Sequence, residues 1–262
     1  MKLKNLYILL FGCLLFGCTG VNVISSDSGS SGSDRNINER SRLPAKPFFS
    51  KEKPARNVIL LIGDGMGISQ ITAGMYANGN KLALENFLQI GFHKNYAYND
   101  LITDSAAGAT AFSCGQKTYN GAIGVGPDTS AIYTILEEAE DKKYMMGLVT
   151  TSTIVHATPA SFIAHNRSRK NYEEIALDFL NTDVDVFIGG GLKFFSGRED
   201  GRNLIPEFEN NGYYMSSFLE SEIDEIDFKD HNKIGYLTAN NSPLPVIQGR
   251  KYLPEATRKT LE

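Results

Sequence analysis

Short apolar runs that end in small or polar residues recur along the chain, and they constrain its fold more than any other feature. The segments 58–62, 145–152 and 184–191 have this composition, and the first and last lead into glycine-rich turns. Apolar runs of this length predict strands covered on both faces, as in parallel sheets. Such strands need a layer of helices on each side of the sheet.

Apolar residues at helical spacing separate these runs. Ile68, Ile71 and Met75 follow the first run, and the segment 172–180 places its apolar side chains on one stripe. Strands that alternate with helices of this length predict an α/β fold with a mostly parallel central sheet and helices on both faces. Functional groups in such sheets gather beyond the carboxyl ends of the strands, where the glycine-rich turns lie. After the last run the pattern loosens into polar segments around short elements, and a final helix starts near Pro254.

The composition is that of a folded protein. The chain has 262 residues, of which 42% are hydrophobic, and its formal net charge is −4 without long basic runs. This content of apolar side chains supplies a sizeable core and excludes a disordered chain. We do not expect nucleic acid as a partner, because binding to a phosphate backbone needs clustered Lys and Arg.

The N-terminus has the pattern of a bacterial lipoprotein signal peptide. Residues 1–17 combine a basic start with an apolar stretch that is too short to span a bilayer. The sequence LLFGC occurs twice, and lipidation at Cys18 is favoured because cleavage before Cys13 would leave only about seven apolar residues. Residues 18–43 then form a flexible Ser/Gly-rich tether. We expect an exported protein with a lipid anchor in the bacterial envelope, in the periplasm or at the outer membrane.

Asp64 is the first candidate for chemistry. It lies between two glycines directly after the run 58–62, so its carboxylate can project into a crevice with no bulky neighbour. A carboxylate in that position suits a cation such as Mg²⁺ or Zn²⁺. The alternative is a plain Asp-Gly turn. A Walker phosphate loop is excluded, because no Gly-Lys-Ser/Thr sequence follows.

The segment TDSAAGATA surrounds Ser105 with small residues. One interpretation is helix capping by Thr103, Asp104 or Ser105. The other places the Ser105 hydroxyl at the positive end of that helix, where a phosphate would also bind. The G-x-S-x-G turn of the α/β-hydrolases is missing, so metal coordination is favoured over activation by a His-Asp pair. We expect the nearby Cys114 to be packed rather than reactive.

A third polar segment, HATPASFIAHNRSR, offers imidazole, hydroxyl and guanidinium groups: His156, Thr158, His165, Arg167 and Arg169. An arginine fork can hold two oxygens of a phosphate at once. The alternative for each residue is a loop hydrogen bond or a surface charge. We expect His165 to be structural, and nothing in the sequence around His93 or His231 suggests a site.

Four segments occur in this order: NVILLIGDGMG, TDSAAGATAFSCGQKTYNGAIGV, TTSTIVHATPASFIAHNRSR and DVFIGGG. Together they resemble the alkaline phosphatase family, from about residue 55 to the end of the chain. The resemblance implies an alkaline phosphatase-like fold that is incomplete at the C-terminus. Residues 44–262 would then be the N-terminal part of the catalytic domain.

The resemblance also implies roles for the candidate residues. Ser105 matches the serine that is phosphorylated and that contacts metal, Arg169 matches the phosphate clamp, and Asp104 contributes to the substrate site. Asp64 matches a carboxylate that bridges a magnesium site and one of two zinc sites. Thr158 matches a magnesium ligand.

His156 matches a further metal position, where some family members carry aspartate and others histidine. Neutral imidazole is a softer ligand than carboxylate, which puts the metal preference of this site in question. The implied function is hydrolysis of phosphomonoesters through a phosphoserine, with two Zn²⁺ sites and one Mg²⁺ site, in a family whose members are commonly homodimers. Most zinc ligands of the family lie in a C-terminal portion that these residues do not include, so we expect impaired activity. The alternative is a non-catalytic envelope lipoprotein that binds phosphate or a partner.

Overall fold

The structure, a computed structural model, describes residues 6–7 and 55–262. Residues 56–262 belong to a single compact unit. The predicted signal peptide, apart from Leu6 and Tyr7, lies outside the described residues, as do Cys18 and the tether. In the described part, no helix is both long enough and apolar enough to cross a membrane.

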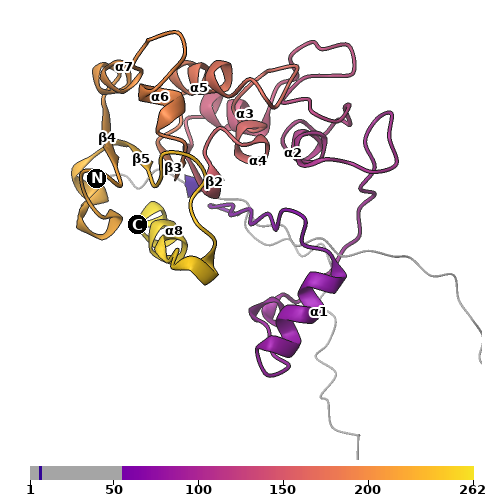
Figure 1. Cartoon of the computed structure of the whole chain (residues 1–262). Helices are drawn as coiled ribbons and strands as arrows, with labels where there is room; N and C mark the ends of the chain where they lie inside the picture. Colours follow the sequence, from indigo (N-terminus) through magenta and orange to yellow (C-terminus); the bar gives the residue numbers. More distant parts are fainter. Residues whose placement is uncertain (1–5, 8–54) are drawn as a thin grey trace, which may run out of the picture. The chain divides into compact units, whose positions relative to one another are not determined.

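A parallel sheet forms the centre of the fold (Figure 1). Its strands run in the order β1-β2-β3-β5-β4, and every neighbouring pair is parallel. The strand bounds are β1 Leu6–Tyr7, β2 Met145–Thr153, β3 Val186–Gly190, β4 Tyr213–Ser217 and β5 Lys233–Leu237. In the register, Val186 of β3 lies opposite Gly147 of β2 and Ile234 of β5. The predicted parallel sheet is confirmed, and β2 and β3 lie where the apolar runs predict them.

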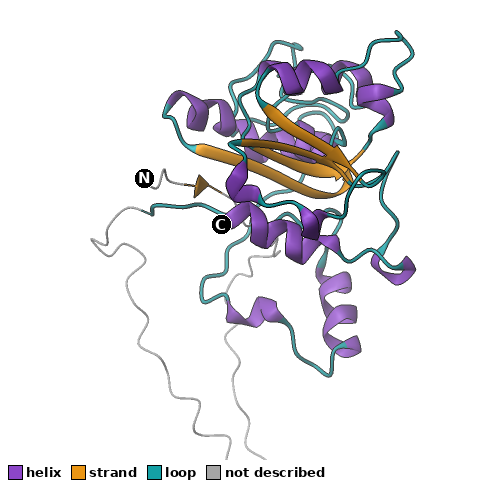
Figure 2. Cartoon of the chain, turned by 90° about the vertical axis from the view of Figure 1, so that its left-hand side faces the viewer, coloured by secondary structure: helices purple, strands orange, loops and turns teal. Residues whose placement is uncertain are grey.

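Helices cover both faces of this sheet (Figures 1 and 2). α8 lies on one face, whereas α5, α6 and α7 lie on the other. The bounds of the helices and of the short 3-10 turns are α1 Ile68–Ala77, η1 Ala83–Asn86, α2 Ser105–Cys114, α3 Ile135–Asp141, α4 Ala157–Ala160, α5 Tyr172–Asn181, α6 Lys193–Ser196, α7 Ile205–Asn210, η2 Ile223–Glu225, η3 Phe228–Asp230, η4 Val246–Gln248 and α8 Tyr252–Leu261. The predicted cover on both faces is therefore confirmed.

The amphipathic stripe of α5 builds one side of the core. It buries Ile175, Ala176 and Phe179, as the spacing predicts. The ring of Phe179 packs edge-to-face on Phe187 of β3, with centroids 5.3 Å apart. Three further aromatic rings complete this cluster: Phe195, Phe208 and Tyr213. Each fully buried Phe contributes about 1.5–3 kcal/mol, so the cluster fixes the helix layer on the sheet.

The segment 58–62 differs from its prediction as a buried strand. It has isolated bridge residues at Leu60 and Ile62 but no continuous ladder, and Leu61 is half exposed. A buried strand needs a neighbour that continues the hydrogen bonds and a layer that covers each face. Within the described part of the chain this segment has neither a continuous ladder nor full cover, which explains why the prediction is wrong.

β4 and β5 are not predicted from the sequence. β4 includes the exposed Tyr214 and ends in two serines, and β5 follows a strongly acidic segment. Their polar surroundings hide the short apolar stretches from a search for continuous runs. Parallel pairing of Tyr213 with Lys233, and onward to Ser217 with Leu237, nevertheless buries most of both strands.

Asp185 is a partly buried carboxylate at the start of β3. Its Oδ2 accepts a hydrogen bond from the Met146 backbone N–H at 2.7 Å. Burial raises the pKa of Asp185, against the effect of that hydrogen bond, and the nearby Asp183 raises it further. Because the folded-state pKa is raised, ionisation of Asp185 lowers the stability of the fold as the pH rises through that pKa.

We therefore expect Asp185→Asn to be more stable than the wild type at pH 7. The difference should vanish below the pKa of an unfolded aspartate, about 3.9, where Asp185 is protonated in both states. Urea unfolding between pH 3 and pH 8 measures both effects. Asp183→Asn is the matched control, because this exposed partner of Lys233 should change the stability by less than about 1 kcal/mol. Equal pH profiles for Asp185→Asn and the wild type would contradict the prediction.

Candidate active site

The N-terminus of α2 places Ser105 at the first helical position. Asp104 is the N-cap residue, because its Oδ1 accepts a hydrogen bond from the Ala107 N–H at 2.9 Å. The Asp104 N–H donates to Asn120 Oδ1 at 2.8 Å, which fixes the entry of the chain into the helix. Capping is therefore done by Asp104, not by Thr103 or Ser105. The half-buried Ser105 hydroxyl stays at the positive end of the helix.

Arg169 joins two of the predicted residues. Its Nη1 donates to Asp104 Oδ2 at 3.0 Å, and its Nη2 lies 3.1 Å from His156 Nε2. A guanidinium can only donate, so His156 Nε2 accepts, which requires a neutral imidazole at that nitrogen. Burial is the main cause that lowers the pKa of His156, and the charge of Arg169 adds to it against that of Asp64. The Arg169 N–H also donates to the Gly121 carbonyl oxygen at 2.8 Å, so both ends of this residue are held.

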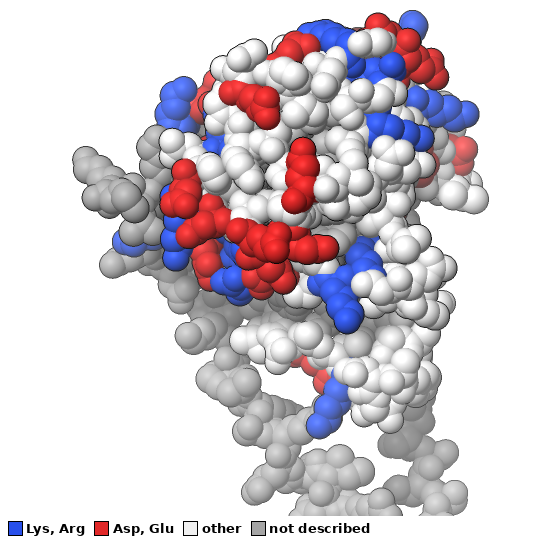
Figure 3. Space-filling view, turned by 60° about the vertical axis from the view of Figure 1, so that its left-hand side comes forward, with Lys and Arg blue, Asp and Glu red and all other residues white. Residues whose placement is uncertain are grey.

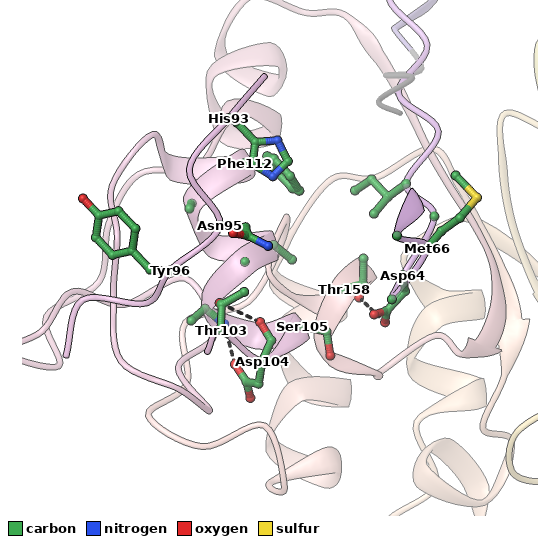
Figure 4. Close-up of a pocket in the computed structure, with 18 of the residues that line it drawn as sticks. Asp64, Met66, His93, Asn95, Tyr96, Thr103, Asp104, Ser105, Phe112 and Thr158 are labelled. Carbon is green, nitrogen blue, oxygen red and sulfur yellow. Dashed lines mark hydrogen bonds between the residues drawn. The ribbon is translucent and has the colours of Figure 1, made fainter. Parts of the chain in front are cut away.

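Asp64 and Thr158 meet from two distant parts of the sequence. Asp64 lies in the turn after the segment 58–62, where Gly65 adopts a φ of +64°. Thr158 lies in α4, which follows the carboxyl end of β2. The Thr158 hydroxyl donates to Asp64 Oδ2 at 3.1 Å (Figure 4). The glycine-rich turn thus presents its carboxylate to the end of the sheet.

One cavity of about 340 Å³ collects these groups. Its lining includes Asp64, Asp104, Ser105 and Thr158, and Figure 4 shows Ser105 between Asp104 and Thr158. Arg169 and His156 connect to it through the hydrogen bond of Arg169 to Asp104. The structure therefore brings the predicted site residues together, at the carboxyl end of β2 and the N-terminus of α2.

The glycines that end β3 have a structural role. A side chain at Gly190 would collide with the Asn241 carbonyl oxygen, and one at Gly189 would come 3.1 Å from the Ile154 nitrogen. These close approaches explain why small residues end this strand. Neither glycine lines the cavity that holds Ser105.

Two residues of the cavity wall were not expected from the sequence. His93 packs edge-to-face on Phe112 of α2, with ring centroids 5.6 Å apart. Lys117 lies with its Nζ 3.8 Å from the centroid of the Tyr96 ring and donates to the Lys94 carbonyl oxygen at 3.0 Å. Both residues lie in loops whose sequence has no regular apolar pattern, so no local signal identifies them as part of the cavity wall.

The remaining histidines and Cys114 have structural surroundings. His165 contacts the Gly124 carbonyl oxygen through Nδ1 at 2.7 Å and Glu137 through Nε2 at 3.1 Å, as a structural role predicts. His231 stacks on Tyr214 with centroids 4.1 Å apart. Burial raises the pKa of the Cys114 thiol, which favours the unreactive protonated form, as expected.

A second hollow of about 280 Å³ has charged walls, and two of its cations already have partners. Figure 3 shows acidic side chains gathered beside Lys and Arg on one face of the described part. In the hollow, Lys259 Nζ donates to the carbonyl oxygens of Asp224 and Ile226, both at 2.7 Å. Arg258 pairs with Glu255 and Glu262. The groups that hold these two cations belong to the hollow's own wall or to the neighbouring α8.

The donor groups of the main cavity fit a hard cation but not a complete zinc site. Asp64 and Thr158 offer carboxylate and hydroxyl oxygens, which suit Mg²⁺. His156 Nε2 is engaged by Arg169. Within the described residues, no three His, Cys, Asp or Glu side chains cluster in a way that could hold a metal ion. Zinc in proteins takes at least three such ligands, so the described residues do not hold it alone.

Comparisons with known proteins agree with this geometry. The alkaline phosphatase family model matches residues 55–237. Alkaline phosphatase 3 of Bacillus subtilis is 39% identical over 238 residues, which cover 85% of this chain and 50% of that protein. Alkaline phosphatase of Escherichia coli is 38% identical, over 63% of this chain and 42% of that protein.

Solved structures give the same result. Alkaline phosphatase from the Antarctic bacterium TAB5 superimposes with a TM-score of 0.71 at 39% identity, over 76% of this chain and 58% of that chain. A variant of the TAB5 enzyme solved with magnesium bound gives a TM-score of 0.70 at 37% identity, with the same coverage. The chain spans about half the length of the curated relatives it matches. On these matches, the chain belongs to the alkaline phosphatase family.

Proposed function

We propose that this chain carries the nucleophile and the phosphate-binding group of a metal-dependent phosphomonoester hydrolase, which acts through a phosphoserine on Ser105. The observation that carries the proposal is the convergence of Ser105, the Asp104–Arg169 pair and the Asp64–Thr158 pair on one cavity. The relatives named alkaline phosphatases support it.

The residues of the cavity divide the chemistry between them. Ser105 Oγ loses its proton and attacks phosphorus, so that a new O–P bond forms while the ester P–O bond breaks and the leaving oxygen takes up a proton. Water then hydrolyses the phosphoserine, which releases phosphate and restores the hydroxyl. Arg169 is bonded to Asp104, the residue before Ser105, and has a fork that can neutralise two phosphate oxygens, while Asp104 and His156 keep that fork oriented. Electrostatic stabilisation of this kind supplies most of the catalysis in phosphoryl transfer.

Magnesium is the cation that the described residues fit best. Asp64 and Thr158 would hold it, with His156 nearby. A bound divalent cation would supply positive charge that lowers the proton affinity of the Ser105 hydroxyl and offsets the charge of the phosphate. Zinc would contact Asp64 and Ser105, as the family resemblance implies, but its other ligands are not among the described residues. We therefore propose low activity for these residues alone.

A second candidate is a non-catalytic protein that binds phosphate through Arg169. The observation that favours it is the lack of a metal-binding cluster in the part of the chain that the structure describes. In both cases we propose export and lipid anchoring, with a signal peptide in residues 1–17, lipidation at Cys18 and a tether in residues 18–43. We also propose a homodimer, on the family resemblance alone.

Zinc content and turnover separate the two candidates. After incubation with Zn²⁺ and Mg²⁺, we expect the chain to hold less than one zinc per molecule and to hydrolyse p-nitrophenyl phosphate slowly. Ser105→Ala should remove this residual turnover without unfolding the chain. Phosphate binding without any turnover that depends on Ser105 would favour the non-catalytic candidate. Stoichiometric zinc with fast turnover that depends on Ser105 would overturn the proposed impairment.

A further inference from the structure

The Asn120 side chain holds the chain directly before Ser105 at two points. Its Oδ1 accepts a hydrogen bond from the Asp104 N–H at 2.8 Å, and its Nδ2 donates to the Ile102 carbonyl oxygen at 2.9 Å. A flipped amide would set donor against donor and acceptor against acceptor, so both partners require this orientation. Asp104 thereby keeps the extended backbone, with φ −89° and ψ 174°, that a helix N-cap needs.

Burial does not hold this part of the chain. Leu101 is 89% exposed and Ile102 is 79% exposed. The Ile102 N–H donates to Asp100 Oδ1 at 2.9 Å, which is a bond inside the same loop. The two bonds to Asn120 span 16 and 18 residues, so they tie the loop to a different part of the fold. They supply a restraint that packing does not.

The residues that follow this amide hold the chain at Arg169. The Gly121 carbonyl oxygen accepts a hydrogen bond from the Arg169 N–H at 2.8 Å. Ile123 and Asn166 exchange two backbone hydrogen bonds, at 2.8 and 2.9 Å. One short segment, residues 120–123, thus contacts both the chain that leads into α2 and the chain that carries the guanidinium.

Asp104 connects this restraint to Ser105 and Arg169. Its Oδ1 caps α2, which begins at Ser105, and its Oδ2 accepts a hydrogen bond from Arg169 Nη1 at 3.0 Å. A shift of the Asp104 backbone would therefore move the hydroxyl and the guanidinium relative to each other. Positioning and charge stabilisation supply most of the catalysis in phosphoryl transfer, so such a shift should be felt by a bound phosphate. Asn120 itself is exposed and does not line the cavity.

We propose that Asn120 is a positioning residue of this site, whose two hydrogen bonds set the Ser105 hydroxyl and the Arg169 guanidinium for the same phosphate group. The proposal deepens the proposed function of these two residues and rests on it. A purely structural amide would stabilise only its own loop. Asn203 is such a case, because its Oδ1 accepts a hydrogen bond from the nearby Ile205 N–H at 3.1 Å.

Asn120→Ala tests the restraint in the chain without ligand. We expect amide hydrogen exchange in residues 102–108 to become about tenfold faster, whereas exchange in β3 and β5 should not change. The Asn120 side chain is exposed, so the variant should remain folded, which a urea midpoint verifies. Asn203→Ala removes an exposed amide elsewhere and, as the matched control, should leave exchange in residues 102–108 unchanged. Unchanged exchange there in Asn120→Ala would overturn the proposal.

Phosphate affinity tests whether the restraint positions the site. In isothermal titration with inorganic phosphate, in the presence of Zn²⁺ and Mg²⁺, Asn120→Ala should bind about threefold to tenfold more weakly, which is the effect of one net hydrogen bond. In the Arg169→Ala background the same change should weaken binding by less than about twofold, because Asn120 acts through the guanidinium. Equal losses in both backgrounds, or faster exchange with unchanged affinity, would show a merely structural role and overturn the proposal.

Hydrolysis of p-nitrophenyl phosphate that depends on Ser105 reports on the proposed function separately. If it is absent while both effects of Asn120→Ala are found, the proposed function is wrong and the role of Asn120 in phosphate binding stands. If it is present while Asn120→Ala changes neither exchange nor affinity, only the role of Asn120 is wrong.

Discussion

Replacing Gly124 by alanine should destabilise the folded chain by about 2–5 kcal/mol. Gly124 adopts a φ of +56°, and a Cβ there would lie well inside van der Waals contact of the Ala164 carbonyl oxygen and 3.0 Å from His165 Nδ1. The left-handed backbone accounts for about 1–2 kcal/mol and overpacking for about 1–3 kcal/mol. His165 Nδ1 cannot move freely, because it contacts the Gly124 carbonyl oxygen at 2.7 Å, and Ala164 is fully buried. This loss is a large part of the stability of an ordinary domain.

Variants at two other glycines distinguish the backbone contribution from the overpacking contribution. Gly121 has a φ of +94° with open space where a Cβ would lie, so Gly121→Ala should lose only the backbone contribution. Gly91 has open space and no left-handed φ, so Gly91→Ala should change little. Urea unfolding of the three variants measures the series. Equal losses for Gly121→Ala and Gly124→Ala would show that the contact with Ala164 is not a constraint.

The regular part of the fold could be predicted because its signals are local. The apolar runs at β2 and β3 and the stripe of α5 each depend on residues close together in sequence. β4 and β5 could not be predicted, because their burial comes from parallel pairing with each other and with β3, across polar segments. The segment 58–62 is the opposite case, because a buried strand is predicted there and the structure does not form one. Its apolar run indicates a need for cover, but the described residues supply that cover only in part.

The candidate site was predictable in its members but not in its geometry. Ser105, Arg169 and Asp64 each lie in a recognisable segment. The choice of Asp104 as the helix cap depends on backbone angles, and the contact between Arg169 and His156 depends on how α4 and the following loop fold. Neither is encoded in residue spacing.

Replacing Arg169 by alanine should weaken the binding of inorganic phosphate about 10- to 100-fold. The reason is the loss of charge-assisted hydrogen bonds, which contribute about 1.5–3 kcal/mol, where 1.4 kcal/mol is a factor of ten. Arg169 is held by Asp104 and His156, so little ordering is needed when phosphate binds. Asp104→Asn should keep the arginine but loosen its orientation, and should give a smaller loss.

Isothermal titration with inorganic phosphate, in the presence of Zn²⁺ and Mg²⁺, measures these affinities. Arg167→Ala is the matched control, because Arg167 is exposed two residues away, and removing its charge should change the affinity by less than about threefold. Urea midpoints should show that all three variants remain folded. An equal loss in Arg167→Ala and Arg169→Ala would mean that phosphate responds to the general positive charge of this loop. A loss confined to Arg169→Ala, graded through Asp104→Asn, would mean that the orientation of this one guanidinium determines phosphate binding.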